Sequence, residues 1–161
     1  VRLDFFHDKA YADADTPVPV TGTRGGVRVA GSEPLAATVQ GFNMSHGANY
    51  LTLNVLRRWN RCPQPGCTGR PQPYVGAGLG LMIPHVEATV GAESVSDYQL
   101  TGPAFQLTGG LAYPLASRLS VSGEYRFTRG DASVDIPGGT LDTRLYTHHL
   151  VAGPSLRLPW P

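Results

Sequence analysis

The chain has 161 residues and a formal net charge of +1, and only 16% of its residues are charged. A charge balance this close to neutral gives no support to nucleic-acid binding. The 20 Gly and 14 Pro residues argue against a helical bundle or coiled coil and favour many strands with turn-rich connections. No run of about 18 apolar residues occurs, so we expect no transmembrane helix.

The first part of the chain is predicted to contain two strands separated by a long loop. Residues 1–10 alternate apolar with polar or charged side chains, which is typical of a strand with two different faces. Residues 12–35 are rich in Asp, Thr, Pro and Gly and are predicted to form the loop. The chain is extended again over residues 36–59, most clearly at residues 51–55.

A loop at residues 60–71 contains both cysteines of the chain. Cys62 and Cys67 enclose Pro-Gln-Pro-Gly, a spacing short enough for the two thiols to close a disulfide. A disulfide here would suit a compartment outside the cytosol, and two free thiols in a turn are the alternative.

The next two predicted strands are residues 72–87, which are rich in glycine, and residues 103–113. The polar residues 88–102 between them are predicted to form a loop. Residues 114–117 (Pro-Leu-Ala-Ser) are predicted to be a tight turn into the following strand.

That following strand, residues 118–129, has the clearest pattern in the chain. Leu119, Val121 and Tyr125 alternate with polar residues such as Glu124, which indicates a strand with one apolar and one polar face. Residues 130–143 are then predicted to form a loop, and residues 144–157 the last strand.

Six long strands with alternating short and long connections are typical of an outer-membrane β-barrel. If the 114–117 turn is periplasmic, the strands at 1–10, 72–87 and 118–129 run outward. Six strands would make a very narrow barrel, and eight is the usual minimum. We therefore expect a single all-β domain over residues 1–161, an up-and-down antiparallel transmembrane barrel of eight strands whose first two are missing. A complete six-stranded sheet is the alternative.

Four aromatic residues are predicted to lie at the periplasmic ends of their strands: Trp59, Tyr74, Tyr113 and Trp160. Outer-membrane barrels place such an aromatic girdle at the lipid interface. The alternative is a set of unrelated aromatic residues at the strand ends of a soluble sandwich.

Charged residues on the polar faces of the strands are predicted to fill the lumen. Arg2, Asp4, Glu124 and Arg126 would neutralise one another there, since buried charges are tolerated when paired. An acid/base pair or proton path formed by Asp4 and Glu124 is the functional alternative.

All five histidines are predicted near the outer rim, including His46 and an outward-facing His148. Two or three imidazoles with a carboxylate could bind a divalent metal. The candidate ligands or catalytic residues are His7, Asp8, His85, Glu87 and an inward-facing His149. The alternative is that these are ordinary interfacial polar residues.

Several stretches resemble known families. Residues 73–80 (Pro-Tyr-Val-Gly-Ala-Gly-Leu-Gly) and 120–127 (Ser-Val-Ser-Gly-Glu-Tyr-Arg-Phe) resemble strands of the small OmpA-, OmpX- and OmpW-like barrels of Gram-negative outer membranes. A more specific set resembles alphaproteobacterial barrels labelled lipid A oxidase: residues 3–13 (Leu-Asp-Phe-Phe-His-Asp-Lys-Ala-Tyr-Ala-Asp), 51–54, 84–87, 98–103 and 138–143.

The resemblance implies a location in the bacterial outer membrane, with membrane lipids and lipopolysaccharide as partners. One expected function is a non-enzymatic envelope barrel with a side-chain-plugged lumen and long extracellular loops, in a structural or surface-interaction role. The other is a lipid A-modifying oxidoreductase at the outer-leaflet rim, because the enzymes it resembles use oxygen and a divalent cation to convert a lipid A glucosamine to aminogluconate. A soluble β-barrel or sandwich is the third reading.

Overall fold

The structure, a computed structural model, describes residues 1–11, 15–24, 27–39, 41–59 and 68–156. Among these residues, no helix combines the length and the apolar character that spanning a membrane requires. The elements, in chain order, are β1 (Arg2–Tyr11), β2 (Pro17–Arg24), β3 (Val27–Pro34), the 3-10 helix η1 (Leu35–Ala37), β4 (Gly41–Arg58), β5 (Gln72–Val90), β6 (Glu93–Tyr98), β7 (Gly102–Pro114), β8 (Leu119–Ile136) and β9 (Gly139–Leu156).

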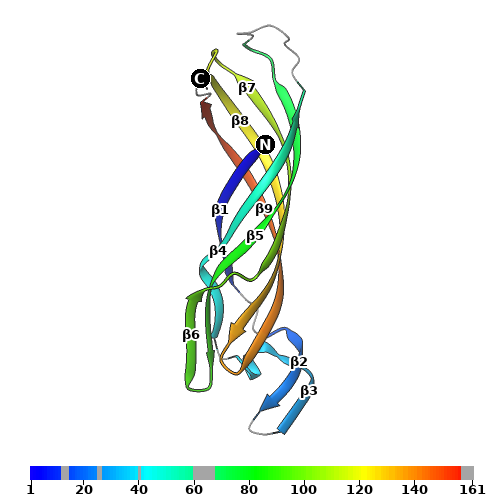
Figure 1. Cartoon of the computed structure of the whole chain (residues 1–161), viewed down its shortest axis with the longest axis vertical. Helices are drawn as coiled ribbons and strands as arrows, with labels where there is room; N and C mark the ends of the chain where they lie inside the picture. The colour runs from blue at the N-terminus through cyan, green and yellow to red at the C-terminus, as the bar shows by residue number, and fades with distance from the viewer. Residues whose placement is uncertain (12–14, 25–26, 40, 60–67, 157–161) are drawn as a thin grey trace.

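The six long strands form one antiparallel sheet in the order β1-β4-β5-β7-β8-β9. Each long strand therefore pairs with the next long strand along the chain, while β6 pairs with β5 and β2 pairs with β3 in a separate hairpin. Figure 1 shows the long strands steeply tilted and wrapped around a common axis. The prediction of an all-β fold with up-and-down antiparallel strands is confirmed, and the six predicted strands are the six long ones.

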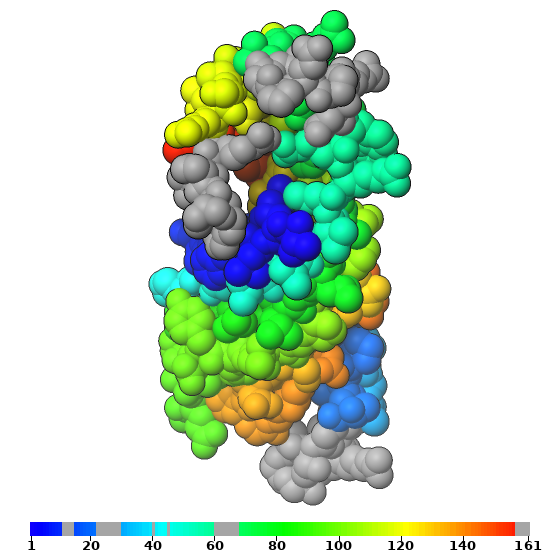
Figure 2. Space-filling view, turned by 45° about the horizontal axis from the view of Figure 1, so that its top comes forward, coloured from blue at the N-terminus to red at the C-terminus, as the bar shows by residue number. Residues whose placement is uncertain are grey.

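The two ends of the sheet differ in what they carry. We call one the hairpin end, because the turn between β8 and β9, the short strand β6 and the β2–β3 hairpin gather there (Figures 1 and 2). The other is the terminal end, which carries the start of β1 and the connection at residues 115–118 between β7 and β8 (Figure 1).

Away from the hairpin end, the faces of the sheet have the reverse of a soluble protein's polarity. On the outward face Leu79, Val55 and Phe5 are 70%, 69% and 67% exposed, whereas the inward Thr52 and Asn54 are fully buried. Strand alternation produces this separation, because successive side chains point to opposite faces. The exposed outward residues are Leu3, Phe5, Leu51, Leu53, Val55, Val75, Leu79, Leu81, Phe105, Leu107, Leu111, Tyr113, Leu119, Val121, Tyr125, Tyr146 and Leu150. We refer to this set as the apolar band.

Side chains fill most of the inner face. Toward the hairpin end an apolar cluster packs under η1, which contributes Leu35; Met44, Tyr50, Met82 and Val86 belong to the same cluster. Toward the terminal end the filling is polar, and Thr52 Oγ1 donates to Gln106 Oε1 at 3.1 Å. The inward Gly78 makes room for this filling, because a Cβ atom there would lie 2.1 Å from Asn54 Oδ1.

Three segments that the sequence analysis assigns to loops are largely strands, and those predictions are wrong. Residues 130–143 are the paired ends of β8 and β9, which meet in a turn where Gly138 has a φ of 79°. Residues 88–102 contain the end of β5, a turn at Gly91 with a φ of 62°, and β6. Residues 12–35 contain β2 and β3.

The loop predictions are wrong because these segments are polar in composition, which hides the alternation of buried and exposed side chains that continues through them. Ala132 and Val134 of β8 are buried, while the intervening Ser133 and the following Asp135 are exposed. The period of two that defines a half-buried strand is therefore present throughout this segment.

In the described part of the chain β1 pairs only with β4, and β9 pairs only with β8. Curling of the sheet nevertheless brings these two edge strands within side-chain contact, since the rings of Phe6 and His149 lie 5.3 Å apart. The curled shape is compatible with a barrel. The expectation of two further strands remains a prediction.

Candidate functional site

The four charged residues expected to share the interior lie together on the inner face. Arg2 Nε donates to Asp4 Oδ2 at 2.9 Å, and Arg2 Nη1 donates to Glu124 Oε2 at 2.8 Å. Arg126 Nε donates to Glu124 Oε1. Because buried charges are tolerable when each has a partner, this network acts first as a structural link between β1 and β8, which are not neighbours in the sheet.

Tyr74 belongs to this network and not to an aromatic girdle, so its predicted place is wrong. Its side chain is buried, and its Oη donates to Glu124 Oε2 at 2.7 Å. The neighbouring Gly110 of β7 provides the space, since a Cβ atom there would lie 2.7 Å from the Tyr74 ring. A phenol is well placed on the inner face because its hydroxyl finds a charged partner there.

The structure describes only some of the other predicted aromatic and cysteine residues. Trp59 and Tyr113 are both exposed. Trp160, Cys62 and Cys67 lie outside the described residues.

The histidines do not form one rim. His148 and His149 lie in the middle of β9, because that strand begins at Gly139 and not near residue 144, so their predicted position at its outer end is wrong. His149 faces inward and His148 faces outward, where its Nδ1 lies 2.6 Å from Tyr125 Oη. His7 faces outward as well, and its Nδ1 lies 2.9 Å from Asn49 Oδ1.

Asp8 and His149 form a pair on the inner face that joins the two edge strands. His149 Nε2 donates to Asp8 Oδ1 at 2.5 Å. Three polar atoms around it, Asp8 Oδ2, His149 Nδ1 and the hydroxyl of Tyr50, are buried and have no hydrogen-bond partner among the described residues. Asp8 and His149 lie on the inner face, whereas two other predicted candidates, His85 and Glu87, lie on the opposite face.

A bulge in β4 makes possible a second cluster of side chains, on the outward face near the hairpin end. The pairing of β4 with β5 passes from Asn43↔Glu87 to Ala48↔Pro84, so β4 carries two more residues than β5 across this interval. Gly47 within the bulge has a φ of 130°, which favours glycine, and a Cβ atom there would lie 2.2 Å from the His7 ring. Bulges of this kind re-aim side chains and are over-represented beside active sites.

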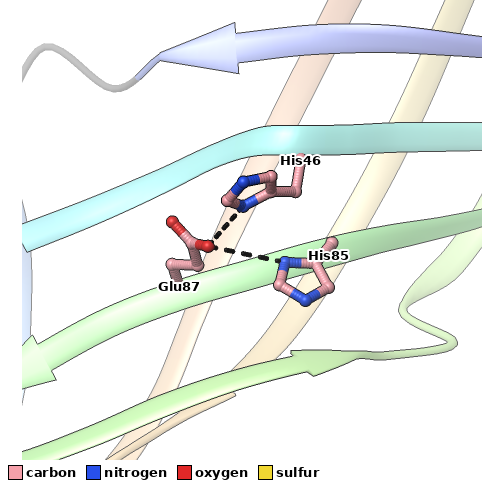
Figure 3. Close-up of side chains that lie close together, drawn as sticks. All are labelled: His46, His85 and Glu87. Atoms are coloured by element: carbon pink, nitrogen blue, oxygen red, sulfur yellow. Dashed lines mark hydrogen bonds and ion pairs between the residues drawn. The ribbon is translucent and has the colours of Figure 1, made fainter.

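The bulge places His46 of β4 beside His85 and Glu87 of β5. Figure 3 shows one oxygen of the Glu87 carboxylate facing a ring nitrogen of each imidazole. His46 Nδ1 donates to Glu87 Oε1, and His85 Nδ1 lies 3.9 Å from the same oxygen. The ligand atoms of the three residues all lie within 4.8 Å of one another, a grouping that could hold a metal ion.

The contacts of Glu87 lower the pKa of its carboxyl group. Partial desolvation raises the pKa of its carboxyl group, but hydrogen bonds from His46 and Asn43, together with the charge of the nearby imidazoles, outweigh that effect and leave the pKa below its ordinary value. A carboxylate that stays ionised can accept a cation as well as a proton donor.

His46 is not among the candidate ligands predicted from the sequence. The sequence does indicate a bulge beside it, because a glycine inside a strand pattern, here Gly47, marks a bulge or a close backbone approach. The bulge changes the register by two residues, and that shift cannot be counted from the sequence of one strand.

Comparison of the chain with protein-family models, with curated proteins and with solved structures returned no match. The features of the chain that indicate a function are the polarity of the sheet and the outward cluster of His46, His85 and Glu87.

Proposed function

We propose that this chain is an outer-membrane β-barrel protein of a Gram-negative envelope, with a lumen filled by side chains and a structural or surface-interaction role. The observation that carries the proposal is the apolar band on the outward face, set against the buried polar and charged residues of the inner face. Membrane barrels have this inverted pattern, with an apolar band toward lipid.

The exposed apolar area argues against the soluble alternative. A soluble monomer rarely exposes a contiguous apolar patch larger than a few hundred Å². Here the band spans all six long strands. Burial of this apolar surface in lipid would be favourable by about 25 cal/mol for each Å² removed from water.

A plugged lumen fits a non-channel role better than a porin. The inner face is occupied by large buried side chains, among them Tyr50, Met82 and Gln106. Small barrels fill their interior in this way, whereas barrels of 16–18 strands leave an aqueous channel. The hairpin end, which carries the β2–β3 hairpin and β6, is then the extracellular end. Lipids and lipopolysaccharide are the partners around the band.

The test is refolding into detergent micelles followed by gel migration with and without boiling. We expect the unboiled protein to migrate differently from the boiled protein, and to require detergent for extraction from cell envelopes. Extraction by salt and chelator alone, with no heat-dependent migration, would contradict the proposal.

A second candidate function is modification of lipid A. The observation that favours it is the position of the His46–His85–Glu87 cluster, which lies on the outward face just beyond the apolar band, where lipid headgroups would be. The chain's resemblance to barrels labelled lipid A oxidase points the same way. Mass spectrometry of lipid A from strains with and without the gene tests it, and identical spectra would exclude it.

A further inference from the structure

We propose that His46, His85 and Glu87 form a binding site for one divalent transition-metal ion on the outward face of the sheet. The proposal goes beyond the envelope role, because metal binding requires neither a membrane location nor an enzymatic activity. Its three residues come from two adjacent strands, and Figure 3 shows all three side chains directed toward one point.

The distances are close to those that a single ion requires. Metal–ligand bonds of 2.0–2.2 Å place the ligand atoms of one ion roughly 3–4 Å apart. His46 Nδ1 and Glu87 Oε1 are already in contact, and His85 Nδ1 lies 3.9 Å from Glu87 Oε1. The His46 side chain is 66% exposed, so its ring can turn from the carboxylate to an ion without disturbing the core.

A second, independent observation is the free nitrogen of His85. Its Nδ1 atom is buried, and no hydrogen-bond partner for it occurs among the described residues. Native proteins rarely leave such an atom unpaired, and an unoccupied ion site is one of the few explanations. The ring is also fixed in orientation, because Tyr98 packs against it edge-on with the ring centroids 4.7 Å apart.

Neighbouring residues of β4 support the ligands. Asn43 hydrogen-bonds to Glu87, with which it pairs in register across β4 and β5. Partners of this kind orient a ligating carboxylate. The two-residue bulge that contains Gly47 is the reason that His46 reaches the same point.

The ligand types define the class of ion. Imidazole suits Zn²⁺, Fe²⁺, Co²⁺ and Ni²⁺, whereas Mg²⁺ and Ca²⁺ prefer sites made of oxygen ligands. Two imidazoles and one carboxylate also leave coordination positions open. These positions would be available to water or to an external ligand at the surface.

The experiment is calorimetric titration of tag-free, chelator-treated protein, refolded in detergent micelles, with Zn²⁺. We expect one equivalent bound per chain at micromolar or tighter Kd, not displaced by millimolar Ca²⁺. Since loss of an orienting partner alone typically weakens binding 10–100-fold, H46Q, H85Q and E87Q should each weaken it at least about 100-fold. Co²⁺ bound in place of Zn²⁺ should give a visible absorption band that the same variants lose.

The matched control is H148Q, which removes another outward-facing imidazole, one outside the cluster. It should bind Zn²⁺ as the unaltered chain does. H46Q keeps the test decisive if H85Q fails to fold, because His46 is largely exposed. Absence of saturable binding, an unchanged Kd in H46Q and E87Q, or an equal loss in H148Q would overturn the proposal.

Discussion

Glu124 shows most clearly how a single residue holds this curled sheet together. Its carboxylate accepts hydrogen bonds from Arg2, Arg126 and Tyr74, so it connects β1, β5 and β8. The bonds from Arg2 and Tyr74 link strands that are not neighbours in the sheet. The network is therefore a link across the interior, and not only a way to neutralise charge.

We expect Glu124→Gln to lower the free energy of unfolding by about 2–4 kcal/mol. Breaking one partner of a buried ion pair typically costs about 3–5 kcal/mol, and the value here is smaller because the Arg2 side chain is 26% exposed. Glu93→Gln, at an exposed position, should change stability by less than about 0.5 kcal/mol. Urea unfolding in micelles, followed by tryptophan fluorescence, measures both, and equal midpoints for the two variants would contradict the prediction.

The residues of this network could be predicted from the sequence, but Tyr74 could not be placed in it. Alternation alone puts Arg2, Asp4, Glu124 and Arg126 on polar faces. Tyr74 has both an apolar ring and a hydroxyl, so its type is compatible with either face. Gly110 of β7 decides the matter by leaving space for the Tyr74 ring inside.

At the scale of elements, strand existence was predictable and strand length was not. Every long strand coincides with a predicted one, because alternation is a local property. The pairing of β8 with β9 over eighteen residues depends on a two-residue turn at residues 137–138, which the sequence analysis places inside a longer loop. The loop prediction therefore places His148 and His149 at a rim where they do not lie.

The β4 bulge is the element on which the metal proposal depends, and it illustrates the limit of single-strand reasoning. His85 and Glu87 could be recognised as neighbours because they are two residues apart on one face. His46 joins them only because two extra residues in β4 shift the register. Register depends on both partners of a pair, so one strand's pattern does not contain it.

At the scale of the whole molecule, inverted polarity is the property that the proposed function requires, and it can be tested at one position. Leu79 lies at the centre of the outward residues of β5 and is 70% exposed. In a bilayer, Leu79→Arg should destabilise the protein by about 2–4 kcal/mol, because arginine at the midplane of a barrel loses its hydration. Leu115→Arg, in the turn at the terminal end, should cost no more than about 1 kcal/mol. Urea unfolding in lipid vesicles measures the difference. If the two variants are equally stable, the band around Leu79 faces water, and the membrane proposal fails.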